Sequence, residues 1–153
     1  MSAAYLSQYF ENQVNTATPE QLMIMLYNGA IRFIGEAEQA MVEKKIAHRG
    51  SRIGKAMAIL SELSATLDHE VGGEIADNLA RLYDYMLRTL LQANLKDDPE
   101  KLAEVKGMLV GLRDTWLDAI DKVHAAMVSE SSEGIAKKSE AAPVGYRPLA
   151  VAL

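Results

Sequence analysis

The stretch from residue 14 to residue 34, VNTATPEQLMIMLYNGAIRFI, constrains the fold more than any other part of the chain. Thr18, Pro19 and Gln21 have the order of a capping box, with Thr18 as N-cap, proline at the first helical position and Gln21 reaching back. On a wheel at about 100° per residue, the apolar positions after this start cover roughly 220°, whereas a bundle helix with one solvent face needs about 100°. The sequence therefore predicts a helix over about 19–43 with apolar surface beyond what one packed face uses.

We assign two roles to this wide apolar arc. One face is expected to hold the core of a bundle and comprises Leu22, Leu26, Ala30, Phe33 and Ala37. The neighbouring part of the arc has the spacing of a helix-in-groove contact and is expected to face a partner; it comprises Ile24, Tyr27, Ile31 and Ile34.

Three further helices are expected after this one. The second begins between Ile46 and Ser51, and Gly72-Gly73 is expected to form the reversal that follows it. The third is expected to begin at Gly73 or Glu74, with Ile75, Leu79, Leu82, Met86 and Leu90 as its central stripe. Asp98-Pro99 predicts the start of the fourth, whose core face is Leu102, Val105, Leu109, Leu112, Trp116, Ile120 and Val123.

No segment has the alternating pattern of a strand, so the fold class is all-α. Helices of this length joined by short turns predict an antiparallel up-down four-helix bundle over 18–128. Residues 1–17 are expected to form a short N-terminal docking arm. Residues 129–153 are rich in Ser, Ala, Gly and Pro and are expected to form a flexible C-terminal tail.

Composition excludes several functional classes. The formal net charge is -5 and the pI is about 5.2, which argues against nucleic acid or an anionic membrane as the main partner. There are no cysteines, hence no disulfide and no thiolate zinc site. The first residues lack the pattern of a secretory signal, and no apolar run approaches the roughly 20 residues of a membrane helix, so a cytoplasmic location is expected.

Candidate chemistry is sparse, and we expect neither enzymatic activity nor a cofactor. The three histidines are His48, His69 and His124, and none of them follows a glutamate at the spacing of a di-metal bundle site. Asp121 and His124 have the i, i+3 spacing of metal ligands, but a single pair with this spacing is common by chance. A phosphotransfer bundle using His48, with Arg49 and Arg52 holding the phosphate, is the alternative from a different functional class.

Three segments together resemble the flagellar secretion chaperone family FliS. The first is Tyr9 with Asn12 and Val14, leading into NTATPEQL and MLYNGAIRF. The second is GGEIADNLARLYDYMLRTLLQANLKDD, residues 72–98, and the third is EVKGMLVGLRDTW, residues 104–116. The likeness covers about residues 5–127. One departure is Asn28, where the family usually has aspartate.

The resemblance implies a cytoplasmic bundle that binds the disordered C-terminal segment of newly made flagellin, prevents its polymerisation and delivers it to the flagellar type III export gate. It also implies that the arm can cover part of the flagellin surface and that Tyr9 contacts the cytoplasmic domain of the export gate. From the helical spacing of the arm's apolar residues, Tyr9 and Phe10 are expected to dock over the groove edged by Ile24, Tyr27 and Ile31. A co-chaperone or competing assembly factor is a further partner expected in such a system. The groove residues that we expect to contact flagellin are Ile24, Tyr27, Ile31, Ile34, Leu87, Leu91, Val110 and Leu117.

Two expectations lie outside the resemblance. The apolar end of the chain, Leu149 to Leu153, is expected to act as a weak pseudo-ligand for the same groove or a neighbouring one. A structural homodimer that buries the surplus apolar face on itself is a third functional alternative.

Overall fold

The described part of the computed structural model consists of residues 8, 11 and 16–132. Over 16–132 the chain forms helices α2 (Pro19–Val42), α3 (Ile46–Ala65), α4 (His69–Lys96) and α5 (Pro99–Ser132), and this range contains no strand. The expectation of an all-α four-helix bundle is confirmed. The arm residues Tyr9 and Phe10 and the tail from 133 onward lie outside the described residues.

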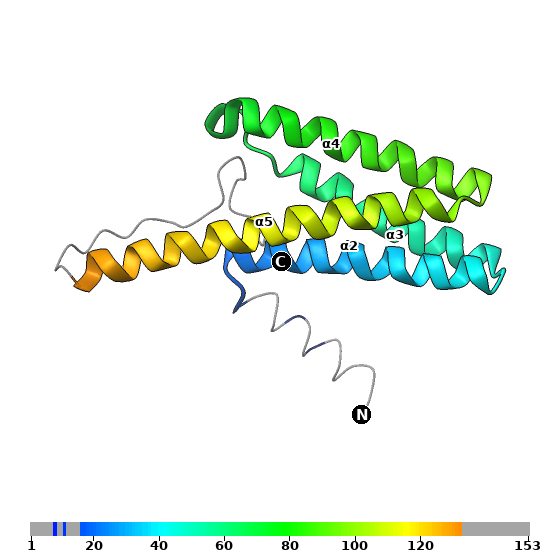
Figure 1. The fold of residues 1–153 in the computed structure, drawn as a ribbon, viewed down its shortest axis with the longest axis horizontal. Helices are drawn as coiled ribbons and strands as arrows, with labels where there is room; N and C mark the ends of the chain where they lie inside the picture. The colour runs from blue at the N-terminus through cyan, green and yellow to red at the C-terminus, as the bar shows by residue number, and fades with distance from the viewer. Residues whose placement is uncertain (1–7, 9–10, 12–15, 133–153) are drawn as a thin grey trace.

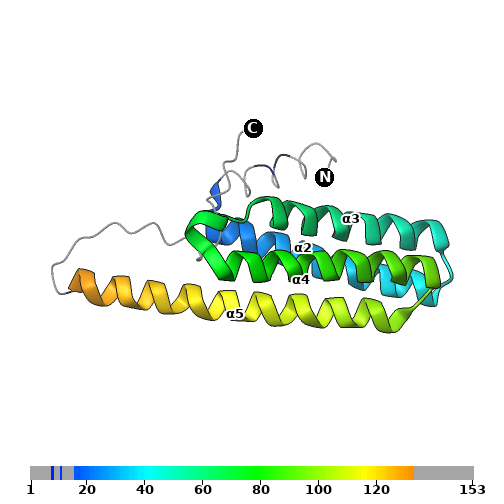
Figure 2. The same cartoon turned by 90° about the horizontal axis from the view of Figure 1, so that it is seen from above.

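The bundle has a simple up-down order. Helices α2 and α4 run in one direction, and α3 and α5 run in the other (Figure 1). Each helix packs on its neighbours in a ring in which α2 contacts α3 and α5, while α4 contacts the same two helices from the other side. Seen from above, α5 extends well past the start of α2 (Figure 2). The last turns of α5 therefore have no helix beside them among the described elements.

Two of the predicted helix starts are confirmed in atomic detail. At α2, the Thr18 hydroxyl oxygen accepts from the Gln21 amide (3.2 Å), and the Gln21 side chain accepts from the Thr18 amide (2.9 Å). At α5, the Asp98 carboxylate accepts from the Glu100 amide (3.0 Å), and Pro99 is the first helical residue. Both caps satisfy amides that would otherwise lack a partner in the first turn.

The predicted start at Gly73 or Glu74 coincides with a break inside α4, where Gly73 has non-helical φ and ψ, but the helical turn before this break was not predicted. That turn begins at His69 because the Asp68 carboxylate caps it, accepting from the amides of Glu70 and Val71 at 3.1 Å. The connection from α3 to the long part of α4 therefore comprises residues 66–68, the short helical segment 69–72 and the break at Gly73. Gly73 marks a kink inside α4, with φ 48° and ψ -123°, a backbone conformation that glycine adopts without the steric penalty of a side chain.

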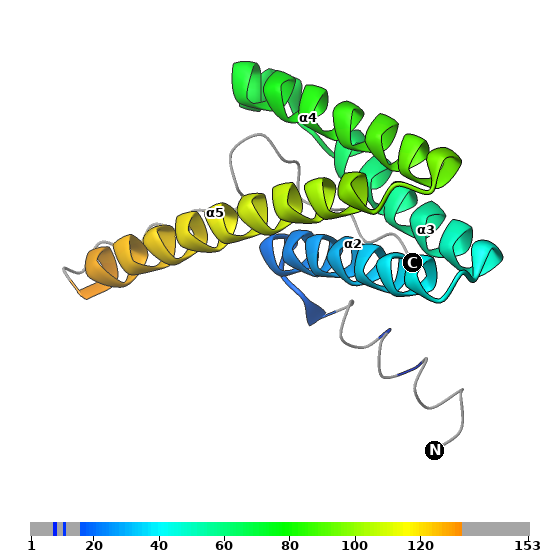
Figure 3. The ribbon, with the colours of Figure 1, turned by 45° about the vertical axis from the view of Figure 1, so that its right-hand side comes forward.

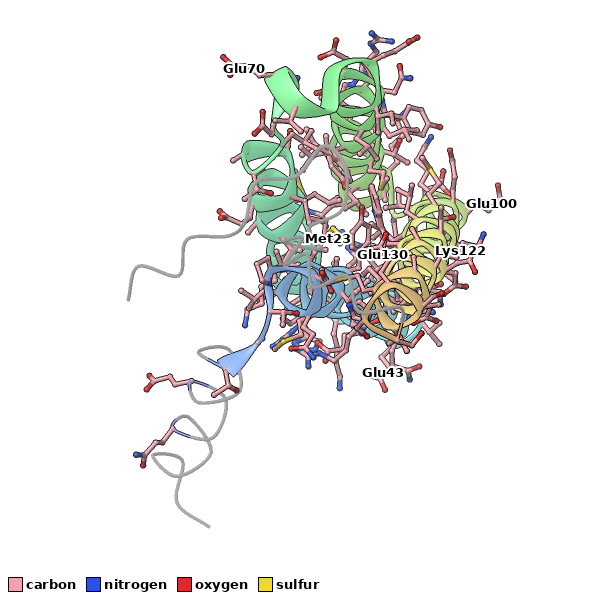
Figure 4. The ribbon with its side chains drawn as sticks, turned by 90° about the vertical axis from the view of Figure 1, so that its left-hand side faces the viewer. Met23, Glu43, Glu70, Glu100, Lys122 and Glu130 are labelled. Carbon is pink, nitrogen blue, oxygen red and sulfur yellow. The ribbon has the colours of Figure 1, made fainter. Side chains whose placement is uncertain are left out.

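The core face of α2 is rotated relative to the expected one. The residues of α2 with no exposed surface are Tyr27, Ala30, Ile34 and Ala37, whereas Leu26 and Phe33 are only half-buried. On the wheel this displaces the centre of burial by roughly 60° toward Tyr27 and Ile34. Viewed along the bundle, Met23 points into the space between the helices, while Glu43, Glu70 and Glu100 lie at its outside (Figure 4).

The predicted stripes of α4 and α5 are buried over only part of their length. Leu79, Met86 and Leu90 are core residues, but Ile75 is 50% exposed and Leu82 is 37% exposed. On α5 the buried set ends at Leu109, and Val123 is exposed. The cause is geometric, since α4 and α5 lie close at the turn that joins them and diverge toward the start of α4 (Figures 1 and 3).

The Asp68 cap is testable by substitution. We expect Asp68→Ala to lower the free energy of unfolding by about 1 kcal/mol, because the Glu70 and Val71 amides lose their acceptor. Asp68→Asn is the matched control and should retain nearly all the stability, since asparagine caps as well as aspartate. Urea titration followed by circular dichroism measures both, and an equal loss in the two variants would contradict the capping role.

Candidate functional site

Tyr27, expected to face a partner, is instead at the centre of a buried hydrogen-bond network. Its side chain has no exposed surface, and its hydroxyl shares a short hydrogen bond with the hydroxyl of Tyr83 on α4. Trp116 on α5 donates its indole N–H to the same Tyr27 oxygen at 3.1 Å. A buried tyrosine hydroxyl requires such partners, so Tyr27 joins three helices and does not line an open groove.

The other expected groove residues separate into four groups. Ile34 is fully buried and belongs to the core, so its expected place on an open groove is also wrong. Ile31 and Leu87 are half-buried and pack against the core, and Val110 is half-buried on α5. Leu91 is 48% exposed on the outer side of α4. The remaining two residues, Ile24 and Leu117, are brought together by the fold.

Ile24 and Leu117 line one pocket between the start of α2 and the second half of α5. The pocket has a volume of about 640 Å³, within the usual range of ligand-binding clefts. Figure 3 shows these two helices lying side by side, with α5 continuing past the start of α2. Its other lining residues are Thr16, Ala17, Thr18, Glu20, Gln21, Met25, Ile120, Asp121 and His124.

The α5 wall of this pocket is one helical face. Leu117, Ile120, Asp121 and His124 are spaced at i, i+3, i+4 and i+7, which places them on adjacent turns. Two apolar side chains are thus followed by an acid and a histidine toward the end of the helix. Leu117 is 39% exposed, which is unusual for a leucine between two packed helices and leaves apolar surface open to an occupant.

An acidic group of α2 lines the pocket. Glu20 is only 7% exposed, and its carboxylate lies 3.2 Å from Nε2 of His124. It occupies the first turn of α2, where the positive end of the helix dipole favours a carboxylate. Glu20, Met25 and Ile120 were not among the groove residues expected from the sequence. The helical wheel nevertheless places Glu20 beside Tyr27 and away from the polar strip.

A second area of open apolar surface lies where α4 and α5 diverge. Ile75 and Leu82 are exposed on α4, and Val123 is exposed on α5. Toward the closed end of this seam, the Tyr85 hydroxyl donates a short hydrogen bond to the Glu104 carboxylate. This bond to an anion raises the pKa of Tyr85, because loss of the phenolic proton would place two negative charges together.

The structure gives the phosphotransfer alternative no phosphate cradle. Arg49 contacts the Asp97 carboxylate at 2.5 Å and the side-chain oxygen of Asn94 at 3.1 Å. Arg52 lies 3.2 Å from Glu36. Both arginines are thus engaged with the bundle itself, while His48 is exposed at the start of α3.

Residues 8, 11 and 16–132 contain neither a candidate metal site nor a membrane-spanning helix. In this part of the chain, His, Asp and Glu side chains form no group of three or more that could hold a metal ion, so Asp121 and His124 remain a pair. Within the same residues, no helix combines the length and apolar character needed to cross a membrane.

Comparison with known proteins first defines the class. The model of a family described as "Flagellar protein FliS" matches residues 1–123. The flagellar secretion chaperone FliS of Bacillus subtilis (strain 168) is 43% identical over 112 residues, which is 73% of this chain and 83% of the relative.

Two more relatives agree with this assignment. The flagellar secretion chaperone FliS of Salmonella typhimurium is 41% identical over 114 residues, covering 74% of this chain and 84% of the relative. That of Vibrio cholerae is 34% identical over 127 residues, covering 83% and 93%. The chain belongs to the FliS family.

The tyrosine network predicts a non-additive pair of substitutions. Tyr27→Phe should lower the free energy of unfolding by about 1–3 kcal/mol, because it removes a buried hydroxyl that Tyr83 and Trp116 both contact. The double variant Tyr27→Phe/Tyr83→Phe should cost less than the sum of the single variants, since the two tyrosine hydroxyls are then removed together. Chemical denaturation measures the cycle, with the exposed Tyr85→Phe as control; additive losses would show that the two hydroxyls are not coupled.

Proposed function

We propose that this protein is a flagellin export chaperone that binds the disordered C-terminal segment of flagellin, keeps it from polymerising and delivers it to the flagellar type III export gate. The observation that carries the proposal is the pocket containing Ile24 and Leu117, which is open in a chain whose relatives are named flagellar secretion chaperones. The protein acts by binding, without an enzymatic step, and works in the cytosol.

The chemistry of the pocket suits an amphipathic peptide segment. Its apolar residues Ile24, Met25, Leu117 and Ile120 come from two adjacent helices, which is the arrangement of a groove that takes a helix or an extended strand. Methionine adapts its shape to different apolar side chains, which suits Met25 to such a role. The Glu20 and Asp121 carboxylates add a preference for a segment that carries a cation.

A disordered partner also explains why the open apolar surface is divided between two areas. A segment that folds on binding loses conformational entropy, so it needs an extended interface to reach useful affinity. The pocket lies on the α2 side of α5, and the exposed residues Ile75 and Leu82 lie on α4. We propose that flagellin occupies both areas, one on either side of α5, and that Leu91, Leu87 and Val110 contribute at the edges.

The N-terminal arm has a separate part in this proposal. Tyr9 contacts the export gate. When flagellin is absent, Tyr9 and Phe10 dock together over the apolar surface. These residues lie outside the described part of the structure, so the gate contact rests on the family resemblance and the docking rests on the helical spacing of the arm's apolar residues. A co-chaperone or competing assembly factor would act on the same surfaces.

The proposal predicts a position-specific loss of affinity. Leu117→Asp should raise the Kd for the C-terminal segment of flagellin from the same organism at least tenfold, about 1.4 kcal/mol, because it places a charge on the apolar floor of the pocket. Val42→Asp is the matched control, since Val42 is 78% exposed at the opposite end of α2, and its Kd should not change. Titration calorimetry gives the affinities and native mass spectrometry the stoichiometry.

Two results would contradict the proposal. The first is the absence of a 1:1 complex between the unmodified chain and flagellin at micromolar concentrations. The second is a stable dimer in light scattering that Leu117→Asp dissociates while flagellin fails to bind, because the open apolar surface would then serve self-association.

A further inference from the structure

The pocket between α2 and α5 also fits a segment of the chain itself. We propose that the C-terminal residues 147–153, RPLAVAL, dock in this pocket, with Arg147 beside the Asp121 carboxylate and Leu149, Val151 and Leu153 on the apolar floor. The inference that the tail docks rests on the lining of the pocket and on the sequence of the tail. Its consequence, that the tail competes with flagellin, rests on the proposed function.

The side-chain pattern of the segment matches the floor. Proline at 148 favours an extended backbone at Arg147, because the proline ring clashes with a helical residue before it. In an extended chain, alternate side chains share a face, so the large apolar residues Leu149, Val151 and Leu153 line one side and the alanines line the other. Leu149 to Leu153 would span about 13 Å, close to the roughly 10 Å between Leu117 and His124 along α5.

Charge separates this segment from the other end of the chain. The tail 133–153 holds three of the 16 Lys and Arg residues (Lys137, Lys138, Arg147) and two of the 21 acidic residues (Glu133, Glu140). Its side chains thus carry +1, and the rest of the chain carries -6. The first 15 residues contain one charged side chain, Glu11, which is acidic. An acidic pocket with Glu20 and Asp121 therefore favours the tail over the arm.

The chain is long enough to reach the pocket without strain. Ser132 ends α5, and Leu117 lies 15 residues before it, about 22 Å along the helix. Arg147 lies 15 residues after Ser132, a length that spans up to about 50 Å when extended. A short tether also gives the tail a high effective concentration at the pocket, so that even a weak contact is populated.

The match to the family gives this segment a distinct place in the chain. The family model ends at residue 123, within the α5 wall of the pocket, so the tail lies outside what the model matches. Docking would place a segment from outside the family match on a pocket whose lining, except for His124, lies within it. Flagellin would then have to displace the tail to occupy the pocket, so the docked tail lowers the apparent affinity for flagellin.

The absence of cysteine allows a direct test in the full chain. A nitroxide label on Ala150→Cys, on the alanine face of the segment, should broaden the methyl resonances of Ile24, Met25 and Ile120. The methyl of Ile46, at the start of α3 and therefore at the opposite end of the bundle, should keep its intensity. Asp121→Arg should lower the ratio of docked to free tail about two- to fivefold, the effect of one exposed ion pair, and the swap Asp121→Arg/Arg147→Asp should restore it.

Several outcomes would overturn the proposal. Unchanged pocket resonances, or equal broadening at Ile46, would show that the tail does not occupy the pocket. Broadening seen only between spin-labelled and isotope-labelled copies in a mixture would assign the pocket to a second copy, and broadening from a label on Ala4→Cys alone would assign it to the arm. None of these measurements uses flagellin, so their failure is distinct from failure of the proposed function.

Discussion

The hydrogen bond between the Tyr27 and Tyr83 hydroxyls fixes the geometry on which the rest of the bundle depends. Helices α2 and α4 lie on opposite sides of the ring of packed helices, and each contacts α3 and α5. Tyr27 and Tyr83 reach across the core between them, and Trp116 joins the same oxygen from α5. Because a buried polar group must keep its partner, this contact sets how far apart α2 and α4 can lie.

The position of this network also determines which surfaces stay open. Before it along α5, the residues Leu102, Val105 and Leu109 are fully buried. After Trp116, α5 still packs against α2 as far as the pocket, whereas α4 diverges from α5 on the other side (Figure 3). Apolar residues continue along α5 past Trp116. The described helices cover this part of the apolar face of α5 only partly.

The sequence predicted the fold because its strongest signals are local. The capping box at Thr18 and the Asp98-Pro99 start are encoded within four residues, and both appear as expected. The break at Gly72-Gly73 was predicted and lies at Gly73, but the helical turn before it was missed because the Asp68 cap that starts this turn is a single residue. A glycine kink within a helix and a glycine at its end have the same sequence pattern.

The candidate site was only partly predictable, and α2 shows why. An apolar arc of roughly 220° does not specify which 100° faces the core. Tyr27 was placed on the partner-facing row because it has helix-in-groove spacing with Ile24 and Ile31, yet its hydroxyl finds buried partners from two other helices, which no local pattern reveals. Ile24 and Leu117 were expected on a flagellin groove from two separate helices, and their meeting in one pocket depends on the packing of α2 against α5, which no local pattern encodes.

The length of α5 has a consequence for how the protein responds to heat and to its partners. The residues after Ile120 are almost all exposed, so this part of the helix is stabilised mainly by its own backbone hydrogen bonds, and a free helix of about 12 residues is marginal in water. Amide exchange should therefore be fastest here, through local opening well below the free energy of global unfolding. Since Asp121 and His124 belong both to this segment and to the pocket, any occupant also selects the helical state of α5. Occupancy of the pocket is thus coupled to a helix–coil equilibrium, and its affinity should weaken with temperature more steeply than that of a rigid site.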